Sequence, residues 1–131
     1  MLLVYDEQNL IPVTPMGDDI RNLQLALREF ARERDWEQFH SPKNLAAALS
    51  VESAELLEHF QWLTEEQSRS LDVDKRVAVG EELADVLLYL LQLADKLQID
   101  PVEAAQNKLQ INASKYPAER ARGRADKYTE L

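Results

Sequence analysis

Residues 75–98 read KRVAVGEELADVLLYLLQLADKLQ, and they carry the clearest secondary-structure signal in the chain. Glu82 and Asp85 stand three positions apart, whereas leucine, valine and alanine occupy most of the other positions. Residues three and four apart share one face of a helix, so the stretch predicts a long helix with one acidic face. A helix that is apolar around so much of its circumference is usually covered on several sides. We therefore expect it to pack against a neighbouring helix and against a second copy of the chain.

Helical spacing also occurs on both sides of this stretch. Apolar residues recur every three or four positions over 18–34. A helix over 42–63 is expected because Ser41-Pro42 combines a capping residue with proline at the first helical position. Asp100-Pro101 marks the start of a last helix, which ends before Tyr116-Pro117. With no strand alternation visible, the chain predicts an all-α fold of four helices.

The two ends of the chain lack this periodicity. Pro12 and Pro15 predict an irregular or weakly extended arm at the start. The last residues are basic and have no apolar period. The expected organisation is an arm over 1–17, a helical domain over 18–117 and a basic tail over 118–131.

Composition narrows the class of function. The 131 residues include 15 Lys and Arg against 24 Asp and Glu, a net charge of −9, which disfavours non-specific binding to nucleic acid or anionic membranes. The absence of Cys excludes disulfides, thiol nucleophiles and zinc-thiolate sites, and only 3 Gly exclude a glycine-rich phosphate loop. No targeting signal or membrane-spanning run is visible. We expect a cytoplasmic protein without nucleic-acid or membrane partners.

Acidic residues gather on the two central helices. At about 100° per residue, Glu52 falls in the middle of the apolar stripe of the helix over 42–63, and Glu55 falls at its edge. A carboxylate on such a stripe is costly unless it is paired or binds a metal. Glu82 and Asp85 alone would suit a solvated face. Antiparallel packing of the two helices would gather all four acids into a site for a hard divalent cation, Mg²⁺ or, as a substitute, Mn²⁺.

These acids and their neighbours resemble a known family. Glu52-Ser-Ala-Glu55 and Glu82-Leu-Ala-Asp85 are similar to the ExxE and ExxD signature of MazG-type nucleotide pyrophosphohydrolases. The flanking stretches, which resemble the dCTP pyrophosphatase branch of that family, are ERDWEQFH over 33–40, FQW over 60–62 and KYT over 127–129. The resemblance spans roughly residues 18–128.

The resemblance implies a MazG-like helical bundle that assembles into a homodimer or a dimer of dimers. It implies Mg²⁺-dependent cleavage of a nucleoside triphosphate, dCTP or a modified dCTP, to the monophosphate and pyrophosphate for nucleotide-pool control. The four acids would be metal ligands, and Glu55 is our hypothesis for the acid that orients or deprotonates water. Some relatives carry His where this chain has Leu27. The substrate-binding candidates are Trp36 and Trp62 at the base, His40 beside them, and Tyr89, Lys108 and Asn112 at the sugar or phosphates.

Other interpretations of the same residues remain open at this point. Both tryptophans could instead belong to a hydrophobic core. His40 could cap a helix or pack against its neighbours, and Lys108 could be an ordinary exposed lysine. The chain as a whole would also suit a non-catalytic helical module for oligomerisation or nucleotide binding. A di-iron bundle requires two inward-facing Glu-x-x-His motifs, whereas this chain has one, Glu37 to His40, in an expected loop. His59 falls close to Glu52 on the helix over 42–63 and is a candidate to support the acids.

Overall fold

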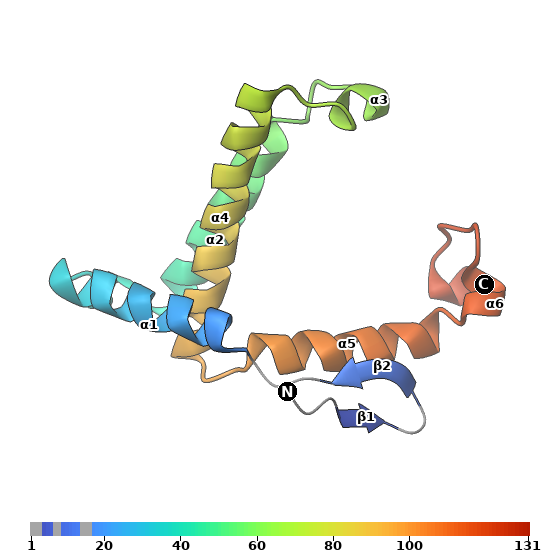
Figure 1. Ribbon diagram of the computed structural model, residues 1–131, viewed down its shortest axis with the longest axis horizontal. Coiled ribbons are helices and arrows are strands. Elements are labelled where there is room, and N and C mark those ends of the chain that lie inside the picture. The colour runs from blue at the N-terminus through green and yellow to red at the C-terminus, as the bar shows by residue number, and fades with distance from the viewer. Residues whose placement is uncertain (1–3, 7–8, 14–16) are drawn as a thin grey trace. The chain divides into compact units, whose positions relative to one another are not determined.

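The computed structural model describes residues 4–6, 9–13 and 17–131 and divides the chain into two compact units (Figure 1). One unit comprises residues 18–99, and the other comprises residues 100–131 together with the N-terminal residues up to Gly17. Within the described residues, no helix is long and apolar enough to cross a membrane.

The unit over 18–99 is built around two long antiparallel helices, α2 and α4, which lie side by side in Figure 1. The first helix, α1, also packs on α4. The elements of this unit are α1 (Asp18–Glu33), the 3-10 turn η1 (Glu37–Phe39), α2 (Pro42–Glu58), the short α3 (Glu65–Ser68) and α4 (Val73–Lys96).

Side-chain caps fix where these helices begin. Ser41 Oγ accepts a hydrogen bond from the Asn44 N–H at 3.2 Å, and Asp72 Oδ1 accepts one from the Lys75 N–H at 2.8 Å. Thr64 forms a reciprocal capping box with Gln67, which begins α3 between the two long helices. Helix α2 ends at Glu58, earlier than the predicted residue 63, because the chain then turns tightly.

Polar contacts fasten α1 to α4. The buried Gln24 side chain donates from Nε2 to the Leu91 carbonyl at 3.1 Å. Arg28 donates two hydrogen bonds of 2.6 Å to the two carboxylate oxygens of Asp95, and Arg21 lies 3.4 Å from the same carboxylate. The hydrogen bond from Arg28 holds the pKa of Asp95 below its usual range. This fork fixes the face that α4 presents to α1.

The apolar core of this unit is small. Leu45 on α2 and Leu91 on α4 are each 1% exposed, and Ala31 and Val79 are also buried. Many other apolar side chains of α4, such as Leu83, remain exposed on the single chain.

The other unit contains an antiparallel strand pair that the sequence pattern does not predict. Strands β1 (Val4–Asp6) and β2 (Asn9–Val13) pair with Val4 opposite Val13 and Tyr5 opposite Pro12. An irregular or weakly extended arm was the expectation there. The strand-forming residues Val4 and Tyr5 explain the difference, and Pro12 is tolerated because a two-stranded pair consists only of edge strands.

Strand β2 lies alongside α5 (Pro101–Lys115) within this second unit (Figure 1). Asp100 caps α5 by accepting hydrogen bonds from the N–H groups of Val102 and Glu103, at 2.9 and 3.0 Å. The region predicted as a basic tail contains a short helix, α6 (Ala118–Ala121), and a 3-10 turn, η2 (Tyr128–Glu130).

Candidate active site

Three carboxylates converge where α2 and α4 pack together. Glu52 on α2 and Glu82 and Asp85 on α4 each offer one oxygen, and these three oxygens lie within 4.8 Å of one another. Glu52 and Glu82 are partly buried, and Asp85 is exposed. The i, i+3 spacing on α4 places Glu82 and Asp85 on one face, and the antiparallel α2 supplies Glu52. This arrangement could hold a divalent cation, because it supplies several hard oxygen ligands.

Two carboxylate oxygens of this cluster lack a hydrogen-bond donor. Glu52 Oε2 and Glu82 Oε2 are buried and accept no hydrogen bond from any amide, amine or alcohol group of the described residues. A buried carboxylate oxygen without a donor is destabilising unless a proton or a cation compensates its charge. The donor set therefore fits a bound Mg²⁺ or a similar cation.

Glu55, the fourth predicted ligand, lies beside Glu52 and is exposed. The pKa of Glu52 is raised to about 7. The largest cause is a hydrogen bond with Glu55, followed by burial and then by the negative charges of Glu55, Asp85 and Glu82. A hydrogen bond between two carboxyl groups requires a proton on one of them. The cation-free cluster therefore retains a proton near neutral pH.

His59 lies at the end of α2 against the same cluster. Its Nε2 atom is 3.7 Å from Glu82 Oε1, so it contacts the acid on α4. The sequence pattern places it on the same helical face as Glu52, about two turns further along the chain.

A cavity of about 330 Å³ opens beside the acids, and we call it the aromatic hollow. Asp85 belongs both to its wall and to the acid cluster. Three of the predicted substrate-binding residues, Trp36, His40 and Tyr89, line it as well. The Trp36 ring meets Phe30 edge to face, with 5.8 Å between ring centroids. The remaining lining residues are mostly apolar side chains of α1 and α4.

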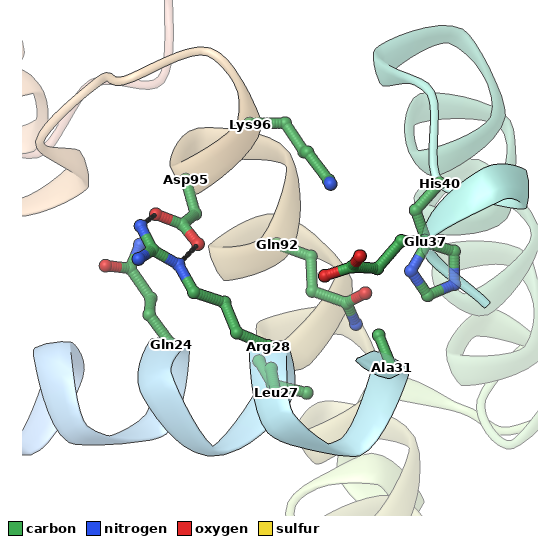
Figure 2. A pocket seen from close by; sticks show the side chains of 9 residues that line it. All are labelled: Gln24, Leu27, Arg28, Ala31, Glu37, His40, Gln92, Asp95 and Lys96. Carbon is green, nitrogen blue, oxygen red and sulfur yellow. Dashed lines mark hydrogen bonds and ion pairs between the residues drawn. The ribbon is translucent and has the colours of Figure 1, made fainter. Parts of the chain in front are cut away.

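A second cavity of about 260 Å³ adjoins the first, and we call it the polar hollow (Figure 2). The two hollows share four lining residues, Leu27, Ala31, His40 and Gln92. Figure 2 shows Glu37 and Gln92 extending into the polar hollow from η1 and α4, respectively.

The remaining substrate-binding candidates lie elsewhere. Trp62 follows α2 and is 87% exposed, and it lines neither hollow. Lys108 and Asn112 stand one helical turn apart on α5, which belongs to the other compact unit. Within residues 18–99, the chain therefore gathers the acids with Trp36, His40 and Tyr89, and it leaves Trp62 on the surface.

Two lining residues carry polar groups that sequence reasoning did not select. The sequence pattern marks Glu37 only within a Glu-x-x-His motif, and it does not single out Gln92 as a binding residue. A signal for Gln92 was present, because it stands seven positions after Asp85 and three after Tyr89, on the same helical face. No spacing rule marks Glu37, which reaches the hollow from a 3-10 turn.

The comparisons with known proteins agree with this geometry. The MazG-like family model matches residues 47–131, which include all four predicted metal ligands. The chain is 47% identical to dCTP pyrophosphatase 1 of Homo sapiens over 119 residues, which cover 89% of this chain and 68% of the human protein. It is 46% identical to dCTP pyrophosphatase 1 of Mus musculus over 119 residues, which cover 89% of this chain and 68% of the mouse protein.

A solved structure shows the same fold. A pyrophosphatase of Archaeoglobus fulgidus is 43% identical and superposes with a TM-score of 0.72, covering 77% of this chain and 94% of that one. The predicted all-α MazG-like fold and the predicted class of enzyme are confirmed. The chain therefore belongs to the MazG-like family, as a nucleotide pyrophosphohydrolase similar to dCTP pyrophosphatase 1.

Proposed function

We propose that this chain hydrolyses dCTP, or a closely related deoxycytidine triphosphate, to the monophosphate and pyrophosphate with Mg²⁺ as cofactor. The observation that carries the proposal is the convergence of Glu52, Glu82 and Asp85 beside a hollow that Asp85 also lines. A triphosphate bound at the acids through a cation would place its nucleoside next to Trp36 and Tyr89. The names of the relatives at 46–47% identity support dCTP as the substrate.

In this reaction water adds across the anhydride bond between the α- and β-phosphates. A bound Mg²⁺ would neutralise phosphate oxygens and align the triphosphate. Glu52, Glu82 and Asp85 would hold it, with Mn²⁺ as a substitute. Glu55 is exposed beside Glu52 and would orient the attacking water or accept its proton.

The aromatic hollow would bind the nucleoside. Stacking of a base on a tryptophan contributes about 1–3 kcal/mol and tolerates any base, so Trp36 would supply affinity without selecting cytosine. Tyr89 stands one turn from Asp85 on α4 and lines the same hollow, and it would contact the sugar. His40 would close the hollow against the ring of Trp36, 6.4 Å away between centroids.

Trp62, Lys108 and Asn112 complete the proposed binding set. An exposed tryptophan, 87% accessible on the single chain, would cover the base once a partner subunit or a bound nucleotide is in place. Lys108 would contact phosphates and Asn112 the sugar or phosphates, from adjacent turns of α5.

Self-assembly is part of the proposal. Leu83, Leu87 and Leu90 on α4 are 52%, 40% and 42% exposed on the single chain. Exposed leucines repeated along one helix are typical of a surface that a second copy covers. We infer a homodimer or a dimer of dimers that uses α4.

A pyrophosphate-release assay tests this function. It compares the four dNTPs and four NTPs with Mg²⁺, with Mn²⁺ and with EDTA. We expect release that is greatest with dCTP and absent with EDTA. Glu52→Gln and Asp85→Asn should abolish release, whereas Glu58→Gln, on the exposed surface of α2, should leave it unchanged. Equal release in EDTA, or full activity of both site variants, would exclude the proposed metal site.

A further inference from the structure

The face of α4 that carries Asp85 continues into the polar hollow. Asp85, Tyr89 and Gln92 stand at positions i, i+4 and i+7, so they fall on one side of the helix. Helical rise separates Asp85 from Gln92 by about 10 Å along the axis. A nucleotide lying along this face, with its phosphates at Asp85, brings the edge of its base towards Gln92.

Three polar side chains of the polar hollow, Gln24, Arg28 and Asp95, are already engaged within the protein. Arg28 is bound to Asp95 through two hydrogen bonds, and Gln24 donates to the Leu91 carbonyl. Glu37 and Gln92 differ, because neither side chain makes a hydrogen bond or an ion pair with any residue in the described part of the chain. Figure 2 shows both extending into the hollow, from different elements. They are therefore free to bind a polar ligand there.

The chemistry of these two groups matches one kind of base edge. A carboxylate only accepts hydrogen bonds, whereas a glutamine amide both donates and accepts. Cytosine presents an amino donor at N4 beside acceptors at N3 and O2, and a carboxylate is a suitable acceptor for the N4 amino group. Uracil and thymine present a carbonyl oxygen at C4 instead, which a carboxylate repels.

We propose that Glu37 and Gln92 read the polar edge of the base and select a pyrimidine with an exocyclic amino group. Glu37 accepts a hydrogen bond from that amino group, and the Gln92 amide donates to a ring nitrogen or carbonyl oxygen. Leu27, shared by both hollows, packs against the ring. This assignment rests on the proposed nucleotide hydrolysis and adds the residues that would determine the base.

The test measures kcat/KM for dCTP and dUTP in the wild type, Glu37→Gln and Gln92→Leu. Glu37→Gln preserves side-chain size and removes the charge, and Gln92→Leu removes the amide with the loss of one non-hydrogen atom. We expect the ratio of dCTP to dUTP activity to fall about tenfold in each variant, with most of the change in KM for dCTP. The matched control is Glu33→Gln, an exposed acid of α1 that lines neither hollow, and it should keep the wild-type ratio.

Unchanged ratios in active, folded Glu37→Gln and Gln92→Leu variants would overturn the assignment. A wild-type preference for dUTP that disappears in Lys96→Met would also overturn it, because Lys96 is a donor in the same hollow and suits a carbonyl oxygen.

Calorimetric binding of dCMP and dUMP separates this inference from the proposed function. If the wild type releases no pyrophosphate yet binds dCMP more tightly than dUMP, and loses that preference in both variants, the base assignment stands and the hydrolysis proposal fails. If dCMP and dUMP bind the wild type equally, or neither binds, the base assignment fails.

Discussion

Replacing Glu52 by glutamine should stabilise the cation-free protein while it removes the metal site. The neighbouring carboxyls and burial raise the pKa of Glu52 from 4.5 to about 7. The folded protein therefore holds the Glu52 proton more tightly than the unfolded chain does. The contribution of Glu52 to the free energy of unfolding is fully present below pH 4.5 and is lost as pH rises through 7.

The magnitude follows from the same pKa values. A rise from 4.5 to about 7 corresponds to about 3 kcal/mol of lost stability above pH 7. Glu52 is only partly buried, so solvent screening reduces this to about half. For a chain of this length, a gain of about 1–2 kcal/mol raises Tm by roughly 4–7 °C. Glutamine avoids the loss because it carries no charge at any of these pH values.

Thermal unfolding in EDTA at pH 5.5 and pH 8.5 measures this effect. Glu52→Gln should gain more stability over the wild type at pH 8.5 than at pH 5.5, whereas Glu58→Gln should show no pH-dependent gain. Added Mg²⁺ should raise the Tm of the wild type and leave that of Glu52→Gln nearly unchanged. A Glu52→Gln protein that is less stable than the wild type at pH 8.5 in EDTA would show that Glu52 serves the fold rather than a cation site.

Three further predictions address the Arg28–Asp95 ion pair, the binding of the base and the self-assembly of the chain. Asp95→Asn should lower the Tm at pH 7 by several degrees, because it breaks the paired hydrogen bonds with Arg28. The difference in Tm from the wild type should shrink as pH falls through the lowered pKa of Asp95, as melting curves at several pH values would show. Trp36→Ala should raise KM for every nucleotide by about 5- to 150-fold with little change in kcat, as steady-state kinetics would show. Leu87→Glu should shift the protein to a smaller species in analytical ultracentrifugation, because it places a charge on the exposed leucine face of α4.

The helices of the structure could be predicted from the sequence because their periodicity and their caps are local signals. Ser41-Pro42 and Asp100-Pro101 begin α2 and α5 as expected. The convergence of Glu52 with Glu82 and Asp85 could also be predicted, since each pair occupies one helical face and the short connection makes the helices antiparallel.

Other features depend on tertiary packing, which one sequence does not display. The pairing of β1 with β2 joins residues that show no alternating pattern. The exposure of Trp62 follows from the early end of α2 at Glu58 and the turn after it, whereas its apolar character alone favours burial. Glu37 reaches the polar hollow only because η1 turns the chain after α1.

Helix α4 links the two halves of the proposed reaction. Its acidic residues, Glu82 and Asp85, belong to the cation site, and its residues one and two turns later, Tyr89 and Gln92, line the hollows. A rigid helix fixes the separation between these positions at about 1.5 Å per residue. The distance from phosphates to base is thus set by the backbone of one element, and α1 holds that element in place through Arg28 and Asp95. A substitution that breaks the Arg28–Asp95 ion pair should therefore weaken base selection as well as stability, although neither residue lies in the acid cluster.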